Sequence, residues 1–202
     1  MVTGKSDLFT PVEAALRKEI GASSDFDLNP GFALPENRKL RPAAVLVPLI
    51  ERGNGLHVFL TKRASTLQHH PGQVAFPGGK VDETDANPSA AAIREAEEEI
   101  GLPSGHARVL GELASHETVT SFLITPIVAE VTREFWPRPE PGEVDEVFTV
   151  PFSYLMQPEH FRIESRMWRG VRRRYYTIPY GPYYIWGATA RILRGLAERM
   201  KT

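Results

Sequence analysis

The chain has 202 residues, with 24 lysine and arginine residues against 25 aspartate and glutamate residues, a formal net charge of −1. This length suffices for one domain with its own core, and the charge balance excludes the basic character of general nucleic-acid binders. With 42% hydrophobic residues and no cysteine, the sequence is typical of a globular domain without disulfides or a thiol nucleophile. Its apolar runs are shorter than the roughly 18 residues of a membrane span, and residues 1–6 lack the apolar core of a secretory signal. We therefore expect a cytoplasmic protein without a membrane partner.

Helix, turn and strand signals divide the first part of the chain. Apolar residues recur at helical spacing after Thr10, which we expect to cap a helix with Pro11 at its first position. A β-branched apolar run and the hairpin signal Asn54-Gly55 predict two paired strands. The expected elements are a helix over 10–20, a turn-rich connection over 21–41, a buried strand over 43–50, a turn over 51–55 and a partner strand over 56–63.

A long glycine-containing segment and a capped helix follow. Residues 65–87 show little periodicity, and long loops of this kind are often functional. Asn87 as the cap, Pro88 at the first position and Gly101 after the end predict a helix over 88–100. One stripe of this helix is suited to packing on a sheet, and it consists of Ala92, Ala96 and Ile100.

The remaining chain mixes strands with helices and shows no repeat. We expect strands over 107–113 and 122–131, a proline-containing loop over 136–145, a short helix near 151–156, a hairpin over 161–176 around Gly170 and a closing helix over 185–200. This mixture argues for one α/β domain. We expect residues 1–40 to be a helix and connecting segment of the same unit as the domain over 41–202. The N-terminal forty residues could cover the sheet or the interface of a homodimer.

Four carboxylates gather in the last turns of the helix expected over 88–100. Glu95, Glu98 and Glu99 share one face, whereas Glu97 points elsewhere. Mutual repulsion and the helix dipole both disfavour this arrangement, each by about 0.2–1 kcal/mol. A hard dication would offset that cost, because Mg²⁺ takes carboxylate oxygens and keeps waters for substrate phosphates. A solvated acidic face is the alternative interpretation.

The acidic helix end belongs to a longer pattern. Residues 94–102 read Arg-Glu-Ala-Glu-Glu-Glu-Ile-Gly-Leu and follow the segment Phe76-Pro-Gly-Gly79. Together they resemble the Nudix box, in which Gly, five residues, Glu and seven residues precede Arg-Glu-aliphatic-x-Glu-Glu-x-Gly-aliphatic. Here Gly79 is followed by five residues and then by Asp85 rather than Glu, and eight residues rather than seven separate Asp85 from Arg94.

This departure, with an upstream signature, resembles the coenzyme A pyrophosphatase branch of the Nudix hydrolases. The signature reads Leu60-Thr-Lys-Arg-Ala64, then His70-Pro-Gly-Gln-Val-Ala-Phe-Pro-Gly-Gly79. The resemblance covers roughly residues 43–197. It implies a Nudix-type α/β/α sandwich with a central mixed β-sheet, Mg²⁺ or Mn²⁺ as cofactor, and a small-molecule substrate. The implied reaction is hydrolysis of the pyrophosphate of coenzyme A to phosphopantetheine and adenosine bisphosphate.

The resemblance also implies roles for the residues of the box. Glu95 and Glu99 are the expected principal metal ligands, and Glu98 is a further ligand or the base that aligns water. The carbonyl of Gly79 can complete the metal shell. Arg94 is expected to orient a box carboxylate through a bidentate pair.

Residues around the box are expected on the substrate side. Arg63 could contact phosphate, and a surface salt bridge is its alternative role. His70 lies in the upstream signature, with simple packing as the alternative, and Gly78 is either a substrate contact or a turn glycine. Asp85 could cap the loop or reach the metal through water, and we favour the structural role.

A later acid often activates water in this family. Glu143 is the expected residue. The alternatives are Asp145, Glu146 and the pair His116-Glu117.

A basic cluster lies in the expected hairpin, where residues 166–174 hold five arginines. One interpretation is a solvated hairpin. The other is a docking surface for the extra phosphate of coenzyme A, or for an anionic partner.

Two other functions compete with coenzyme A hydrolysis. One is a Nudix pyrophosphatase for another nucleoside diphosphate derivative, such as ADP-ribose, NADH or a dinucleoside polyphosphate, and the upstream signature disfavours it. The other is a nucleotide-sensing Nudix module without catalysis, which the presence of Glu95, Glu98 and Glu99 disfavours.

Overall fold

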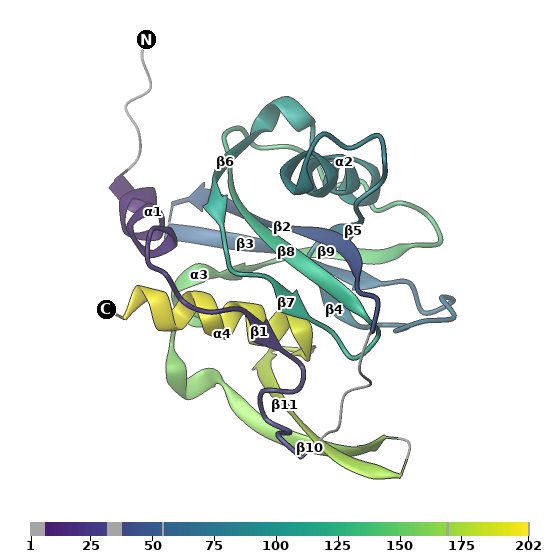
Figure 1. Ribbon diagram of the computed structural model, residues 1–202. Helices are drawn as coiled ribbons and strands as arrows, with labels where there is room; N and C mark the ends of the chain where they lie inside the picture. Colours follow the sequence, from purple (N-terminus) through teal and green to yellow (C-terminus); the bar gives the residue numbers. More distant parts are fainter. Residues whose placement is uncertain (1–6, 32–37, 54, 169, 202) are drawn as a thin grey trace.

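A large mixed sheet with helices on both faces forms the body of the protein (Figure 1). The computed structural model describes residues 7–31, 38–53, 55–168 and 170–201. Its helices are η1 (Asp7–Phe9), α1 (Thr10–Leu16), α2 (Pro88–Ile100), η2 (Ser104–His106), α3 (Phe152–Leu155), η3 (Pro158–His160) and α4 (Ala188–Met200). In this described part, no helix combines the length and apolar character that a bilayer crossing requires.

The large sheet is mixed because its central strand has neighbours of both directions. Strand β2 runs parallel to β8, with Val47 opposite Val128, and antiparallel to β3, with Leu49 opposite Val58. Within the described residues the sheet has nine strands, in the order β1-β7-β8-β2-β3-β4, with β5 also paired to β2, β6 to β8 and β9 to β3. The strands are β1 (Ser23–Ser24), β2 (Arg41–Arg52), β3 (Gly55–Arg63), β4 (Val74–Ala75), β5 (Gly78–Lys80), β6 (Ala107–Glu112), β7 (His116–Glu117), β8 (Phe122–Val131) and β9 (Val144–Pro151). This arrangement confirms the predicted α/β class.

A second, three-stranded sheet holds the basic cluster. It consists of β10 (Arg162–Trp168), β11 (Val171–Tyr180) and β12 (Tyr183–Trp186) in antiparallel order. Gly170 lies in the turn with a φ of 78°, a conformation that glycine adopts without strain, so the predicted hairpin is confirmed. Arg169 lies outside the described residues, as does Asn54 of the predicted turn between β2 and β3.

Helix α2 covers one face of the large sheet through the stripe that the sequence predicted. Ala92, Ala96 and Ile100 are fully buried and pack in one cluster with Leu46 and Ile127 of the sheet. Small residues on the helix allow close approach to the sheet, so this contact fixes both the depth and the rotation of α2. This rotation places Glu95 and Glu99, in the last turns of α2, against the backbone of β5.

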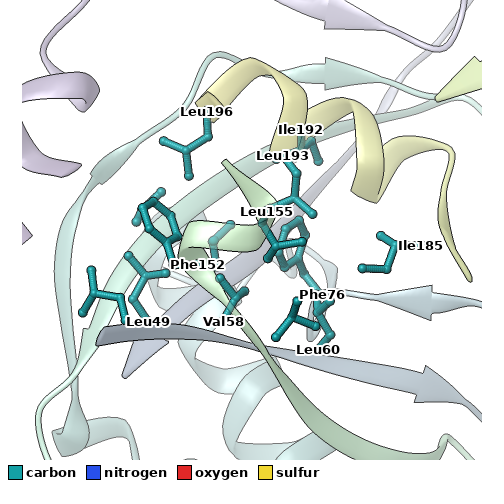
Figure 2. Packing of buried hydrophobic residues seen from close by; sticks show 14 of the residues in the cluster. Leu49, Val58, Leu60, Phe76, Phe152, Leu155, Ile185, Ile192, Leu193 and Leu196 are labelled. Carbon is teal, nitrogen blue, oxygen red and sulfur yellow. The ribbon is translucent and has the colours of Figure 1, made fainter. Parts of the chain in front are cut away.

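The opposite face is covered by α4 and α3. Figure 2 shows Leu193 and Leu196 of α4 above Leu155 and Val58, in a cluster of large apolar side chains. Helix α1 joins this layer through Val12, and it contacts α4 and β6. Residues of the N-terminal segment therefore cover the large sheet, which is one of the two arrangements expected for them. The division of the chain at residue 40 stays a prediction.

Helices α1 and α4 differ from the sequence prediction at three boundaries, and the loop predicted over 136–145 already enters β9 at Val144. Helix α1 ends at Leu16, and its cap is Phe9 rather than Thr10, because the turn η1 leads into the helix with Phe9 already in a helical conformation. Ile185 belongs to β12, where it pairs with Ile178, so the closing helix begins only at Ala188.

The segment predicted as a loop over 65–87 contains two short strands. Strand β4 pairs with β3 through Thr61 and Ala75, and β5 pairs with β2 through Ala44 and Gly79. Strands of two or three residues carry no periodic pattern, because their pairing is set by the neighbouring strands rather than by their own side chains.

Candidate functional site

The acidic helix end is held in place by a well-defined α2. Asn87 caps the helix, accepting a hydrogen bond from the amide of Ala90 at 2.9 Å, and Pro88 occupies the first position. Gly101 ends the helix in a left-handed conformation, with φ of 71°. All three signals predicted from the sequence are confirmed, so the carboxylates lie on the faces that the 3.6-residue period assigns to them.

Glu99 is the most buried of these carboxylates, with 5% of its surface exposed. Its Oε2 accepts a hydrogen bond of 3.1 Å from the amide of Gly78. Burial, with the nearby charges of Glu95 and Glu143, raises the pKa of Glu99 to about 7, although the Gly78 amide and the charge of Arg63 oppose this rise. The cost of burying this carboxylate therefore exceeds the compensation that Gly78 and Arg63 provide.

Glu95 lies beside Glu99 and against the glycine pair. Burial raises the pKa of Glu95, as do the charges of Glu98 and Glu143, while Arg94 acts in the opposite direction. A side chain at position 79 would overlap the Glu95 carboxylate as it now lies, so any larger residue there would displace that carboxylate. Gly78 and Gly79 thus bring main-chain polar groups directly to the two carboxylates.

Arg94 holds the acidic residues together. Its Nε and a terminal nitrogen donate to the two carboxylate oxygens of Asp85 at 3.0 and 2.9 Å, the bidentate geometry expected for this arginine. Its other terminal nitrogen donates to Glu95 and Glu98, each at 3.1 Å. The hydrogen bond from Arg94 lowers the pKa of Asp85, and the Asp85 carboxylate in turn raises the pKa of Arg94.

These hydrogen bonds show the place of Asp85, the residue that departs from the Nudix box. Asp85 also accepts a hydrogen bond from the amide of Asp82 at 2.9 Å, so it closes the turn that precedes α2. Its two oxygens are thus occupied by Arg94 and the backbone, in agreement with the favoured structural role. The connection between Asp85 and Arg94 has one extra residue, and the hydrogen bonds from Arg94 attach Asp85 to α2.

The donor set suits a hard divalent cation. Glu95 and Glu99 offer carboxylate oxygens, both with raised pKa values, and the backbone of Gly79 lies close to Glu95. Across the described ranges, no three acidic or histidine side chains stand ready to hold an ion by themselves. Mg²⁺ does not require such a set, because it is held by one or two carboxylates together with water and substrate phosphates. The carboxylates of Glu95 and Glu99 fit such an ion, and the Gly79 carbonyl stays the predicted further ligand. Glu98 is exposed and pairs with Arg94.

Of the later acids, Glu143 lies near the carboxylates of α2. It immediately precedes β9, is exposed, and its charge contributes to the raised pKa values of Glu95 and Glu99. Asp145 accepts a hydrogen bond of 2.9 Å from the amide of Ser65. Glu146 accepts one from the hydroxyl of Tyr183.

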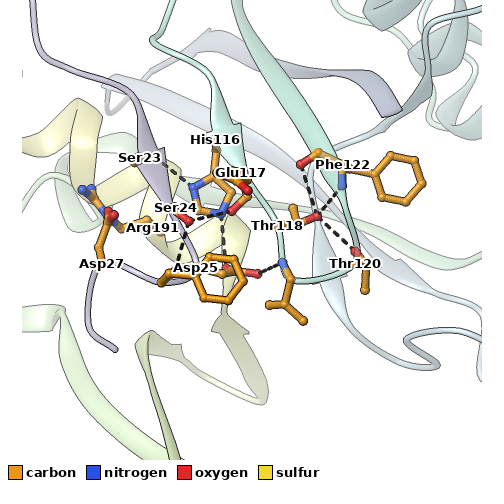
Figure 3. A network of polar contacts seen from close by, with 12 residues as sticks. Ser23, Ser24, Asp25, Asp27, His116, Glu117, Thr118, Thr120, Phe122 and Arg191 are labelled. Carbon is orange, nitrogen blue, oxygen red and sulfur yellow. Dashed lines mark hydrogen bonds and ion pairs between the residues drawn. The ribbon is translucent and has the colours of Figure 1, made fainter. Parts of the chain in front are cut away.

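The alternative pair His116-Glu117 lies in a different network, which Figure 3 shows. His116 is fully buried, with Nδ1 at 2.9 Å from the Ser23 hydroxyl and Nε2 at 3.2 Å from Asp25. Glu117 forms an ion pair with Arg38. These residues join the N-terminal segment to β7, so the structure does not bring them to the acidic helix end.

Of the substrate-side candidates, only His70 lines a pocket, while Gly78 lies against Glu99. Arg63 ends β3; its amide donates to the carbonyl of Gln73 at 2.9 Å, and the Gly72 amide donates back to its carbonyl at 3.1 Å. His70 lines this pocket, whose volume is about 320 Å³, together with Pro71, Gly72, Gln73, Arg166 and Trp186. Sequence reasoning missed Trp186 because it assigned this residue to the closing helix, and missed Gln73 because a lone glutamine in a loop carries no signal.

Comparison with known proteins agrees with this geometry. A NUDIX domain model matches residues 39–170. The chain belongs to the Nudix hydrolase family. An uncharacterized Nudix hydrolase, NudL, of Enterobacter sp. (strain 638) is 42% identical over 158 residues, 78% of this chain and 81% of the relative. A protein of the same name from Salmonella paratyphi B is 42% identical over 163 residues, 80% of this chain and 84% of the relative.

Solved structures show the same fold at low sequence identity. A Nudix hydrolase from Alicyclobacillus acidocaldarius has a TM-score of 0.52 at 19% identity, covering 82% of this chain and 97% of that one. The Nudix domain of Shewanella oneidensis NrtR, crystallised with ADP ribose, has a TM-score of 0.51 at 14% identity, covering 85% and 92%. In this Nudix protein the box therefore lies on α2 and the preceding strand β5, within the matched domain.

Proposed function

We propose that this Nudix protein is a metal-dependent hydrolase that cleaves the pyrophosphate bond of coenzyme A or its derivatives, releasing phosphopantetheine and adenosine bisphosphate. The observation that carries the proposal is the contact between the two sequence signatures. The upstream signature ends in Gly78 and Gly79, whose backbone lies against Glu99 and Glu95. Its Arg63 is close enough to influence the Glu99 carboxylate electrostatically.

The carboxylates have distinct roles in this proposal. Glu95 and Glu99, with the Gly79 carbonyl, hold Mg²⁺ or Mn²⁺, and Glu98 is a further ligand or aligns the attacking water. A divalent ion bound there would neutralise phosphate charge and acidify a bound water. Glu143 is the acid that activates water from the loop before β9, since it faces the same carboxylates.

The remaining candidate residues orient the carboxylates or bind the substrate. Arg94 is a positioning residue, because it holds Glu95, Glu98 and Asp85 rather than facing a cavity. Arg63, at the end of β3, contacts the diphosphate, and Gly78 supplies backbone close to it. His70 lines the adjoining pocket and belongs to the substrate side.

The test is a substrate panel. The protein is incubated with Mg²⁺ or Mn²⁺ and with coenzyme A, acetyl-coenzyme A, ADP-ribose, NADH or a dinucleoside polyphosphate, and the products are separated by chromatography. We expect phosphopantetheine from coenzyme A as the fastest reaction. Faster turnover of ADP-ribose or NADH would refute the proposed substrate, and tight nucleotide binding without hydrolysis would identify a sensing module instead.

The metal-site assignment has a matched control on the same helix. Glu99→Gln keeps the shape and the hydrogen bond to Gly78 but removes the charge, and we expect turnover to fall by about 10³-fold, the scale of losing a main electrostatic contribution. Glu97 is exposed and points away, so Glu97→Gln should leave turnover unchanged. Full activity of Glu99→Gln would show that this residue does not bind the metal.

A further inference from the structure

The pocket beside the glycine-containing segment differs chemically from the acidic site. It lies between residues 70–73 and the three-stranded sheet, which contributes Arg166 of β10 and Trp186 of β12. Its volume of about 320 Å³ is within the range of small-molecule sites. The box carboxylates do not line it.

Positive charge faces this pocket. Arg166 stands directly opposite Arg173 in the register of β10 and β11, a like-charge pair that is unfavourable across strands, and the carboxylate of Asp25 compensates Arg173 in part. Partial burial lowers the pKa of His70, and the charges of Arg63 and Arg166 lower it further. Glu164 lies on the same strand as Arg166, and its carboxylate accepts a hydrogen bond of 2.7 Å from the hydroxyl of Tyr184.

Aromatic rings hold Arg166 in place. Its guanidinium lies 4.3 Å from the centre of the Trp186 ring and 5.9 Å from that of Tyr175. The two rings meet edge to face, with centres 5.4 Å apart. An arginine fixed in this way loses little conformational freedom when it binds a phosphate.

The first turn of α4 adds to the positive electrostatic potential near the pocket. Trp186 is followed by Gly187, which takes the cap position of α4 with φ of 65° and has no side chain to cap the helix. The thirteen-residue helix therefore begins beside the pocket with its positive end. This contribution adds to that of the arginine and does not stand alone.

Arg63 connects the pocket to the acidic site. Its charge acts on Glu99 on one side and on His70 on the other, and its backbone is bonded to Gly72 and Gln73 of the pocket wall. A ligand whose diphosphate is held near Glu99 and Arg63 would direct a group that neighbours that diphosphate toward the pocket. In coenzyme A one such group is the ribose with its separate phosphomonoester.

We propose that this pocket is a second anion subsite, in which Arg166, positioned by Trp186, binds the ribose phosphomonoester of the substrate and selects for substrates that carry it. The inference rests on the proposed function, since it assigns the recognition of one part of that substrate. Arg166 is a specificity-determining residue, and Trp186 is a positioning residue.

The experiment compares coenzyme A with 3′-dephospho-coenzyme A, which has the same diphosphate but lacks the phosphomonoester. We expect the wild-type protein to prefer coenzyme A. Arg166→Gln should lower kcat/KM for coenzyme A by about 10- to 100-fold, the scale of a hydrogen bond to a charged group, and leave the dephosphorylated substrate within about twofold. Arg166→Lys should retain part of the preference. Arg172→Gln is the matched control, because this exposed arginine lies opposite Met167, one position along β10 from Arg166 and hence on the other face.

A binding arm separates this inference from the proposed function. Calorimetry without metal compares adenosine 3′,5′-bisphosphate with AMP, and the wild type should bind the bisphosphate more tightly, a difference that Arg166→Gln removes. If the wild type hydrolyses neither coenzyme, the proposed function fails, and this arm alone decides the subsite. Equal losses on both substrates, no wild-type preference in either arm, or the same effect from Arg172→Gln would overturn the subsite.

Discussion

Replacing Glu99 with glutamine is expected to stabilise the metal-free protein while inactivating it. The Glu99 carboxyl is 5% exposed, and its pKa lies at about 7, against an ordinary value of 4.5. At about 1.4 kcal/mol for each tenfold change in proton affinity, this difference corresponds to about 3 kcal/mol of destabilisation once the group is ionised. Glutamine removes the charge and still offers an oxygen to the Gly78 amide.

The sign follows from which state of the protein binds the proton more tightly. The folded state has the higher pKa for Glu99, so unfolding releases a proton between pH 4.5 and about 7. The free energy of unfolding therefore falls as the pH rises through this window. The advantage of Glu99→Gln over the wild type should grow from under about 1 kcal/mol at pH 5 to about 3 kcal/mol at pH 8.

Urea unfolding in the presence of EDTA, at pH 5 and pH 8, measures this difference. Glu97→Gln is the control, since Glu97 is exposed, and it should match the wild type at both pH values. Mg²⁺ should narrow the gap at pH 8, because a bound cation stabilises the wild type and has less affinity for the variant. A variant that is no more stable than the wild type at pH 8 would show that the Glu99 carboxylate is compensated by the protein itself.

Three further substitutions test the site and its support. Gly79→Ala places a methyl group on the Glu95 carboxylate, so turnover should fall at least tenfold with little change in thermal stability; an active variant would contradict the close approach. Asp85→Asn weakens the bidentate pair with Arg94, and kcat should fall about tenfold while KM changes less, measured by steady-state kinetics. Leu193→Ala removes a fully buried side chain beneath α4 and should cost about 2–5 kcal/mol in urea unfolding, with unchanged kcat at a temperature where the variant is folded.

The sequence predicted α2 almost completely because local signals determine this helix. The cap at Asn87, the stop at Gly101 and the apolar stripe each act within a few residues, and each appears in the structure as predicted. The sequence also predicted that Arg94 pairs with a nearby carboxylate, although it did not specify Asp85. Burial of Glu99 was not, because it depends on how closely the β5 backbone approaches the helix.

Contacts between distant segments account for the rest of the differences. Trp186 and Ile185 follow the helical pattern of α4 in sequence, yet pairing with β11 places them in a strand. The arginine cluster predicted a surface that binds anions. Its sequence does not distinguish Arg166 from Arg172, although Arg166 lines the pocket and Arg172 lies on the other face. Strand register decides this, and register is set by tertiary pairing rather than by composition.

The near-zero net charge of −1 conceals local charge centres of opposite sign, and Arg63 influences a residue in each. Glu95 and Glu99 form an acidic centre, in which burial raises the pKa of both carboxylates. Arg166 marks a basic centre in the pocket, and Arg63 acts on both sides. A substrate that carries only a diphosphate can use the acidic centre through its metal, but it gains nothing from the basic one. Under the proposed function, a substrate with a third phosphate gains from both, and we expect the distribution of charge, rather than its total, to favour coenzyme A over the other nucleoside diphosphate derivatives.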